Sequence, residues 1–361
     1  MLVLGIESSC DETALALVDN SGVRASVISS QADIHALFGG VVPELASREH
    51  CRLIGPLLDS LLAQSGLGDD PWKHIDRIAV TRGPGLMGSL LVGVAFAKAL
   101  SLAHGIPLIG VDHLLGHLLA VEMEEPVEFP ALGVLISGGH THLCRMDSPV
   151  DMIVLGRTID DAAGEACDKF AKMAGLPYPG GALLDALGKR GHADPRLFPR
   201  PYTHNDNLDF SFSGLKTAGS LWLSQHPECR FPAGDTPARE RLGLAGQELC
   251  DAAASYLLAV AETLSIKAER AMSLFSPRSI IVAGGVAANS VVRSVFRVLA
   301  EKRRLPLHIP SLSLCGDNAV MIARAGWRMA QAGRHHDLSL SAIPRGQVIP
   351  EDWTCGAAQA C

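Results

Sequence analysis

Two stretches of the 361-residue chain place a short apolar run, a small polar turn and a second apolar run in succession. The first joins Leu2 to Ile6 with Ala14 to Val18, and the second joins Leu132 to Ile136 with Thr141 to Cys144. Runs of this length around turn residues predict β-hairpins. Because the same pattern recurs far along the chain, it indicates a duplicated α/β architecture.

Strands that run into glycine turns and then into helices form a second pattern. Ile78 to Val80 precedes a glycine turn at 82–88 and an apolar helix at 89–104, and Ile280 to Ala283 precedes Gly284-Gly285 and a further helix. Apolar residues at helical spacing predict other helices over 46–62, 160–176, 243–275 and from Asp317 onward. Strands alternating with helices favour an α/β fold.

Three polar segments interrupt these elements. Residues 188–211 carry prolines and basic side chains and predict a long exposed loop, and 225–240 predicts a mobile surface connection. The segment 346–361 has no pattern and is expected to be a loose tail.

Composition narrows the possible partners. The formal net charge is −7, so no overall basic field attracts nucleic acid. RNA binding would need a local patch or a partner. Six basic residues in the second half are candidates for such a patch: Lys169, Lys172, Lys189, Arg190, Arg196 and Arg200.

The cysteines and the apolar runs indicate a cytoplasmic protein. Nine cysteines occur without a CxxC pair, which favours reduced thiols. The opening MLVLGIESS lacks a basic region, so we expect no signal peptide. Glycine, histidine or charge interrupts each apolar run before the roughly 20 residues that a membrane span needs, so we expect no membrane partner.

The run DHLLGHLL (112–119) carries the clearest candidate chemistry. His113 and His117 are four residues apart, so a helix would place both imidazoles on one face, where they can share a metal ion. Zinc peptidases have a glutamate beside the first histidine, but Leu114 stands there. The pattern therefore disfavours a protease and leaves two alternatives, another kind of metal site or two core histidines.

Asp317 is a candidate third ligand, because two histidines and one carboxylate commonly bind divalent iron or zinc and leave positions open. An aspartate before a helix also fits a plain N-cap. Asp112 has the same two interpretations, a partner of the ligands or a helix cap. His140 and His142 are further possible ligands, although strand alternation also accounts for them.

Glycine turns at Gly284-Gly285 and at Ser137, Gly138 and Gly139 offer backbone amides to a phosphate group. Packing alone also explains glycines at such turns. Together the turns fit a nucleotide held in a cleft between duplicated lobes. The chain has no GxxxxGK[ST] motif, so this is not a P-loop site.

Nine short motifs follow one another along the chain: GIESSCDETA, GGVVPELASREH, GPGLMGSLLVG, HLLGH, ISGGHT, GEACDKFAKMAGLPYPGG, SFSGLKTA, GGVAAN and CGDNAVMIA. Through them, residues 1–343 closely resemble the bacterial tRNA N6-adenosine threonylcarbamoyltransferases, once described as O-sialoglycoprotein endopeptidases. The resemblance implies the two-lobed α/β fold of actin, Hsp70 and sugar kinases, a duplicated ribonuclease H-like fold with a nucleotide cleft between its lobes. We expect lobe I to comprise 1–110 and about 325–345, and lobe II to comprise 111–324, with the metal and nucleotide at the lobe interface.

The resemblance also implies a reaction. Enzymes of this family transfer threonylcarbamoyl from threonylcarbamoyl-AMP to N6 of the adenosine next to the anticodon, in tRNAs that read codons starting with A, and release AMP. By resemblance, His113, His117 and Asp317 bind one Fe(II) per subunit, with other divalent metals possible. Activity is tied to Asp11 and Glu12. Donor-binding positions match Leu135, Ile136, Ser137, Gly138, Gly139, Asp168, Gly181, Asp185 and Asn289.

Implied partners are tRNA, an inactive paralogue that dimerises with the enzyme, and a small P-loop ATPase. Three rival functions stay open: an ATP-dependent kinase or ATPase of the same fold, a metalloprotease, and a non-catalytic scaffold. The chain departs from the family pattern at Arg82, where we expect a small residue and which we expect to touch ligand or solvent. It also departs in the long 225–240 connection and in the tail.

Overall fold

The structure is a computed structural model that describes residues 1–231 and 238–355. The chain forms two compact units, one made of Met1–Pro126 with the segment from Gly316 onward, the other of Val127–Cys315. The two units meet between residues 126 and 127 and between 315 and 316, whereas we expected the lobes to meet at 110/111 and 324/325. Position 110 lies inside a strand, and the helices that follow 112 and 318 both pack within the first unit.

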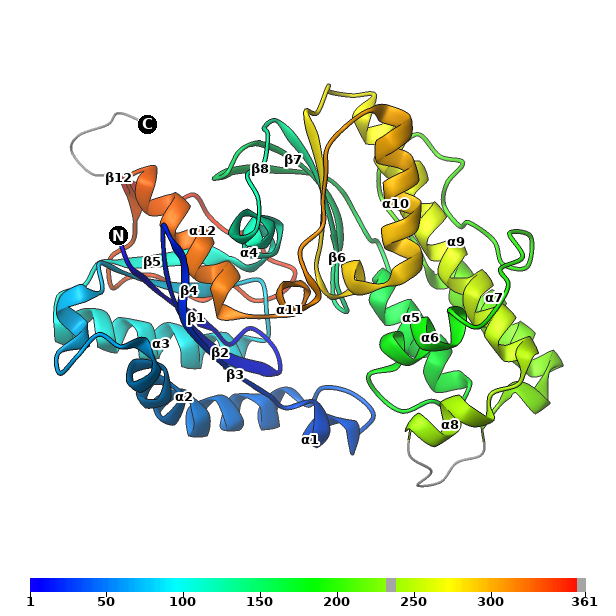
Figure 1. The fold of residues 1–361 in the computed structure, drawn as a ribbon, viewed down its shortest axis with the longest axis horizontal. Helices are drawn as coiled ribbons and strands as arrows, with labels where there is room; N and C mark the ends of the chain where they lie inside the picture. The colour runs from blue at the N-terminus through cyan, green and yellow to red at the C-terminus, as the bar shows by residue number, and fades with distance from the viewer. Residues whose placement is uncertain (232–237, 356–361) are drawn as a thin grey trace. The chain divides into compact units, whose positions relative to one another are not determined.

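The first unit is built on a five-stranded sheet in the order β3-β2-β1-β4-β5 (Figure 1). Its strands are β1 (Val3–Glu7), β2 (Glu12–Asp19), β3 (Gly22–Ser30), β4 (Arg77–Gly83) and β5 (Leu108–Asp112). β1 pairs antiparallel with β2, with Val3 opposite Val18, and parallel with β4. The first predicted hairpin is therefore confirmed.

Helices cover both faces of this sheet. They are α1 (Ala32–Ala36), α2 (Pro43–Ser65), η1 (Pro71–His74), α3 (Met87–His104), α4 (His113–Leu119), η2 (Ala120–Met123) and α12 (Ala319–Gln331). Leu4 and Ile6 share a hydrophobic core with residues of α2 and α3. Gly5, on the opposite face of β1, lies against α12 so closely that a Cβ would stand 2.4 Å from the carbonyl oxygen of Ala319. A side chain at this position would push α12 off the sheet.

The second unit repeats this topology in a sheet of order β10-β9-β6-β7-β8. Its strands are β6 (Ala131–Ile136), β7 (Thr141–Ser148), β8 (Asp151–Arg157), β9 (Ser279–Ala283) and β10 (Leu307–His308). β6 pairs antiparallel with β7 and parallel with β9, as β1 does with β2 and β4. The second predicted hairpin and the duplication are thus confirmed.

The helices of the second unit surround its longest helix, α9. They are α5 (Ala163–Met173), α6 (Gly180–Gly188), α7 (Ser213–Gln225), η3 (Pro227–Cys229), α8 (Ala238–Leu244), α9 (Gln247–Met272), η4 (Gly285–Ala288), α10 (Ser290–Arg303) and α11 (Leu312–Cys315). Tyr256 of α9 stacks on Phe170 of α5 with ring centroids 4.3 Å apart. The segment 188–211 is mostly irregular, as predicted, but Phe198, Leu208 and Phe210 are buried, so it is not simply an exposed loop.

Two helices, α3 and α9, are long and apolar enough to span a membrane, judged by length and composition alone. This differs from our expectation that every apolar run is too short for a membrane span. α9 is largely buried in the core of the second unit, and α3 packs one face against its neighbours in the first. Core helices often pass such a test, so this finding is weak evidence for a membrane span.

The tail is anchored through residue 355, which corrects the prediction of a loose segment. β12 (Thr354–Cys355) pairs antiparallel with β11 (Arg334–His335). Arg82 is 1% exposed, and its Nη2 donates to Oδ2 of Asp352 at 3.0 Å. Arg82 therefore holds the tail rather than touching ligand or solvent. Residues 356–361, including Cys361, lie outside the described part of the chain.

Candidate metal centre and donor-binding residues

The two histidines of the HLLGH motif share one face of α4, and every residue of this helix is buried. The carboxylate of Asp112 accepts a hydrogen bond from the backbone nitrogen of Leu114 at 2.7 Å, so Asp112 is the helix cap. The rings of His113 and His117 lie 4.6 Å apart between centroids and are inclined by 81°. The predicted spacing therefore brings both imidazoles together.

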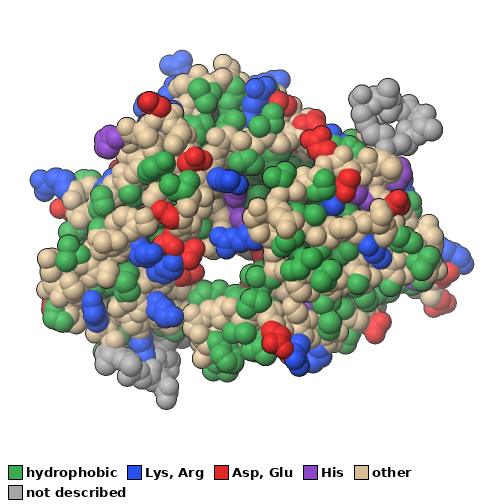
Figure 2. Space-filling model, turned by 180° about the vertical axis from the view of Figure 1, so that it is seen from behind, with side chains coloured by type: hydrophobic (Ala, Val, Ile, Leu, Met, Phe, Trp, Pro, Cys, Tyr) green, Lys and Arg blue, Asp and Glu red, His purple; other side chains and the backbone are tan. Residues whose placement is uncertain are grey.

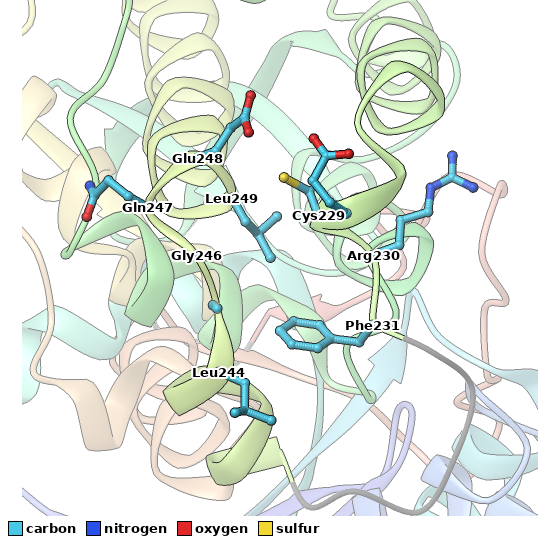
Figure 3. Close-up of a pocket in the computed structure, with 10 residues that line it drawn as sticks. Cys229, Arg230, Phe231, Leu244, Gly246, Gln247, Glu248 and Leu249 are labelled. Carbon is cyan, nitrogen blue, oxygen red and sulfur yellow. The ribbon is translucent and has the colours of Figure 1, made fainter.

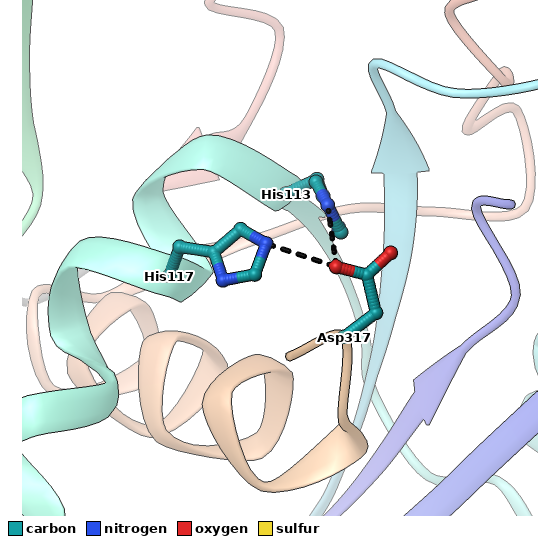
Figure 4. Close-up of side chains that lie close together, drawn as sticks. All are labelled: His113, His117 and Asp317. Atoms are coloured by element: carbon teal, nitrogen blue, oxygen red, sulfur yellow. Dashed lines mark hydrogen bonds and ion pairs between the residues drawn. The ribbon is translucent and has the colours of Figure 1, made fainter. Parts of the chain in front are cut away.

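Asp317 completes a trio with them (Figure 4). Its Oδ1 lies 3.0 Å from Nε2 of His117 and 3.5 Å from Nε2 of His113. The N-cap of α12 is the next residue, Asn318, whose side chain accepts from the nitrogen of Met321 at 2.9 Å. Since the capping role is filled, the carboxylate of Asp317 is directed at the histidines instead.

Glu7 is a fourth member of this centre that the sequence analysis missed. It has no solvent exposure, and its Oε2 lies 3.1 Å from Nδ1 of His113. The hydroxyl of Thr81 donates to the same carboxylate at 2.6 Å, and the backbone nitrogen of Ser9 donates to its other oxygen. A carboxylate on Nδ1 leaves Nε2 to face the ligand position, as second partners of metal-bound histidines do.

Opposite charges hold the trio together in this structure. Burial opposes the charged imidazole of His113, but the carboxylates of Asp317 and Glu7 outweigh this and raise its pKa well above the usual value. Burial likewise opposes ionisation of Asp317, yet His113 and His117 hold its pKa well below the usual value. His113 and Asp317 are thus both held in their charged forms although they are buried.

The donor set fits a divalent metal ion. Nδ1 of His117 is buried and has no hydrogen-bond partner within the described residues. Two imidazole nitrogens and one carboxylate oxygen, all within 4.8 Å of one another, suit iron(II) or zinc and leave further coordination positions open. His113, His117 and Asp317 are therefore the candidate metal ligands.

The acidic pair of the first hairpin lies in the same unit. Asp11 is buried, and Glu12 begins β2, where Ser30 Oγ donates to it at 3.3 Å. Burial, followed by the carboxylates of Asp317 and Asp11, raises the pKa of Glu12 to about 9. The same factors, burial first, raise the pKa of the neighbouring Cys10 thiol. Glu12 therefore keeps its proton at neutral pH unless a cation is close by.

The expected donor loop is the turn between β6 and β7 in the second unit. Leu135 and Ile136 are fully buried strand residues, so their side chains support the loop from inside the core. The amide of Ser137 donates to the carbonyl of His140 at 2.8 Å, which corrects our expectation that this amide is available to a phosphate group. Gly138 is exposed at the tip of this turn.

Four of the expected donor-binding residues, Asp168, Gly181, Asp185 and Asn289, lie at or against the starts of α6 and α10. Oδ1 of Asp168 accepts from the nitrogen of Gly181 at 2.8 Å, although burial raises the pKa of this carboxyl. Oδ1 of Asp185 accepts from the nitrogen of Ser290 at 3.0 Å. Asn289 caps α10 by accepting from the backbone nitrogens of Val291 and Val292. Two helix N-termini are thus fixed by these side chains.

His140 and His142 do not take part in a group of three convergent metal-ligating atoms among the residues described. The role of the predicted basic patch in RNA binding stays a prediction. Lys169, Lys189, Arg190, Arg196 and Arg200 are all engaged by carboxylates or backbone carbonyls of their own unit. On the face drawn in Figure 2, acidic and basic side chains are interspersed.

Comparison with known proteins gives a consistent result. A family model described as tRNA N6-adenosine threonylcarbamoyltransferase matches residues 22–324. A protein of that name from Nitratidesulfovibrio vulgaris (strain DP4) is 59% identical over 362 residues and covers 99% of both chains. Another from Lawsonia intracellularis (strain PHE/MN1-00) is 56% identical over 356 residues, covering 98% of this chain and 99% of the relative.

Among solved structures, component A of (R)-2-hydroxyglutaryl-CoA dehydratase from Acidaminococcus fermentans superposes with a TM-score of 0.53 at 13% identity. The match covers 92% of this chain and 99% of that one. At this identity the likeness shows the fold alone. The predicted fold class, that of actin, Hsp70 and sugar kinases, is confirmed.

Proposed function

The chain belongs to the tRNA N6-adenosine threonylcarbamoyltransferase family, and from this we propose that it moves the threonylcarbamoyl group of threonylcarbamoyl-AMP to N6 of the adenosine beside the anticodon. The acceptor tRNAs read codons that start with A, and AMP leaves. The observation that carries the proposal is the convergence of His113, His117 and Asp317 in a chain of this family.

The reaction needs an activated donor, because the exocyclic amine of adenine shares its lone pair with the ring and is a weak nucleophile. A divalent ion on His113, His117 and Asp317, Fe(II) in our proposal and one per subunit, would act as a Lewis acid toward donor oxygens. Glu7 would keep Nε2 of His113 directed at that ion through the contact to Nδ1.

Proton removal from N6 is assigned to Asp11 or Glu12. Because its pKa is raised, the carboxyl of Glu12 already holds a proton at neutral pH and cannot take another. It can act as a base only when a nearby positive charge favours its ionised form. A loaded metal centre would lower this pKa and so prepare the base. Asp11, buried in the same turn, is the alternative base.

The adenosine part of the donor is assigned to Asp168, Gly181, Asp185 and Asn289. The support for this assignment is that hydrogen bonds hold these polar side chains at the starts of α6 and α10. Gly138 and Gly139 are assigned to the phosphate and carbonyl side of the donor, on a turn held by Leu135, Ile136 and Ser137.

The partners are proposed on the same basis. The net charge of −7 and the engaged basic side chains favour an RNA-binding surface completed by other proteins. We assign this role to an inactive paralogue that dimerises with the chain and to a small P-loop ATPase. The proposed compartment is the cytoplasm.

The test combines the purified chain with these partners, threonine, bicarbonate, ATP and unmodified tRNA, and analyses digested nucleosides by mass spectrometry. Threonylcarbamoyladenosine is the expected product, and His113→Ala and Asp317→Ala should abolish it. His192→Ala, at an exposed histidine, is the matched control. Phosphate release from ATP without tRNA, or chelator-sensitive cleavage of casein, would instead favour the kinase or the protease function.

A further inference from the structure

A second cluster of metal-ligating side chains lies in the other unit, between the end of α7 and the start of α9. Here a cavity of about 280 Å³ is lined by residues 228–231 and 244–249 (Figure 3). The sequence predicted a mobile surface connection over 225–240. Its first residues instead form a tight turn, in which the nitrogen of Cys229 donates to the carbonyl of His226 at 3.0 Å.

The thiol of Cys229 is the buried member of this cluster. Its side chain is 7% exposed, and the structure gives the sulfur no hydrogen-bond partner among the described residues. Sγ and carboxylate oxygens of Glu228 and Glu248 lie within 4.8 Å of one another, and in Figure 3 the sulfur and the Glu248 carboxylate are directed toward the space between them. Once deprotonated, this thiol and the two carboxylates would be three adjacent negative groups that a cation would join.

His226 lies beside this group and contacts one of its members, Glu248, as a candidate further ligand. Its Nδ1 lies 2.8 Å from the carbonyl oxygen of Trp222, and its ring stacks on the Trp222 ring at 4.3 Å. Nδ1 therefore carries the proton, and Nε2, which lies 3.2 Å from Oε1 of Glu248, is an acceptor in the neutral ring. Two acceptors this close need a proton or a metal ion between them. A backbone carbonyl on the other ring nitrogen is the usual support of a metal-bound histidine.

We propose that His226, Cys229 and Glu248, with Glu228 as fourth ligand, form a binding site for a divalent transition metal, preferentially zinc. Nitrogen, sulfur and oxygen ligands together suit zinc, whereas calcium and magnesium take oxygen ligands. Zinc holds its ligands at roughly 2.0–2.3 Å, so the ligand atoms must draw together, most of all Nε2 of His226, which lies outside the group of atoms within 4.8 Å of one another. The exposed side chains of Glu228 and Glu248 can make this adjustment by rotation.

Binding exchanges the thiol proton for the metal. Burial, Glu248 and Glu228 raise the pKa of Cys229 to about 11, so the metal-free thiol is protonated at neutral pH. A zinc ion would take the thiolate and Nε2 of His226, so that the thiol proton and the proton held between His226 and Glu248 are both released to solvent. With four protein ligands the site is structural, and the ion would tie the end of α7 to the start of α9.

Cobalt(II) alone is the probe for this site, because a cobalt–thiolate bond absorbs in the near ultraviolet and a site without sulfur does not. The titration uses full-length protein carrying His113→Ala, which disables the first centre. A charge-transfer band should develop with one equivalent of cobalt, and zinc should displace it. Cys229→Ser should abolish the band. Glu248→Gln should weaken cobalt binding at least about 10-fold.

Cys10→Ser in the same background is the matched control, because Cys10 is the thiol near the first centre, and here the band should persist. The proposal is overturned if the His113→Ala protein gives no band, or if the band survives Cys229→Ser. Zinc should also raise the melting temperature of His113→Ala but not that of His113→Ala/Cys229→Ser. This second readout separates a lost ligand from a lost fold, and neither readout depends on catalysis.

Discussion

Nδ1 of His113 lies 3.1 Å from a carboxylate, Glu7, that is completely shielded from solvent by the sheet of the first unit. This contact decides which nitrogen of the imidazole faces Asp317. It also places a negative charge behind the imidazole of His113, on the ring nitrogen opposite the candidate metal position. This charge makes the histidine a stronger metal ligand.

Glu7→Gln keeps the shape of the side chain but removes this charge. We expect metal affinity to fall on the order of 10- to 100-fold, with a parallel loss of product that excess metal restores. Metal competition with a colorimetric chelator measures the affinity. The exposed Glu44→Gln should leave the affinity unchanged. Equal affinities for Glu7→Gln and wild type would show that the contact is not a support of the ligand.

Metal removal should switch the activity off reversibly. A chelator-treated, desalted sample should form no threonylcarbamoyladenosine, because the trio then offers no Lewis acid to the donor. One equivalent of Fe(II) per chain should restore product in the wild type but not in Asp317→Asn. Full activity in a sample shown by elemental analysis to be metal-free would contradict the assigned role.

The tail should contribute to stability through Asp352. Asp352→Asn leaves the buried guanidinium of Arg82 without its charged partner, so we expect the free energy of unfolding to fall by about 1–3 kcal/mol. Urea unfolding measures this change. Glu351→Gln, at the neighbouring exposed carboxylate, is the control. If both variants unfold like the wild type, the tail does not stabilise the unit.

Lys267 should give the stability a characteristic pH dependence. This lysine is buried in α9, and burial together with Arg270 lowers its pKa to about 8 from an unfolded value of roughly 10.4. Between these values the unfolded chain binds more protons than the native one, so stability rises with pH. Relative to Lys267→Met, the wild type should therefore gain stability from pH 8 to about 10, as followed by chemical unfolding. A flat difference would refute the lowered pKa.

Gly164 should control the donor loop. A Cβ at this position would stand 2.7 Å from the carbonyl oxygen of Ser137, so Gly164→Ala must displace the turn. We expect KM for threonylcarbamoyl-AMP to rise while the metal content stays the same. Gly55→Ala in α2, where a Cβ meets nothing within 4 Å, is the steric control. An unchanged KM in Gly164→Ala would remove this turn from the donor site.

The sequence predicted well those features that depend on local periodicity. Alternation and turn residues located both hairpins, and the spacing of His113 and His117 placed their rings together because a helix puts residues four apart on one face. Glu7 was missed, although a glutamate within an apolar strand is itself a signal, since a buried carboxylate needs partners.

Contacts between distant residues could not be predicted in this way. Nothing near Arg82 in the sequence points to Asp352, and residues that lie far apart in the chain carry no shared period. The same limit applies to His226 and Glu248, which are joined by the packing of α7 and α9. The nucleotide cleft and the roles of the donor-binding residues stay predictions.

The discontinuity of the first unit affects how the protein is made. Synthesis proceeds from the N-terminus, and domains fold as they emerge. Gly5 of β1 packs against α12, and this helix is synthesised only after the whole second unit has been translated. Asp317 arrives with that helix, so a truncated nascent chain holds both histidines but cannot complete the centre. Loading of the proposed metal would thereby wait until α12 has been synthesised.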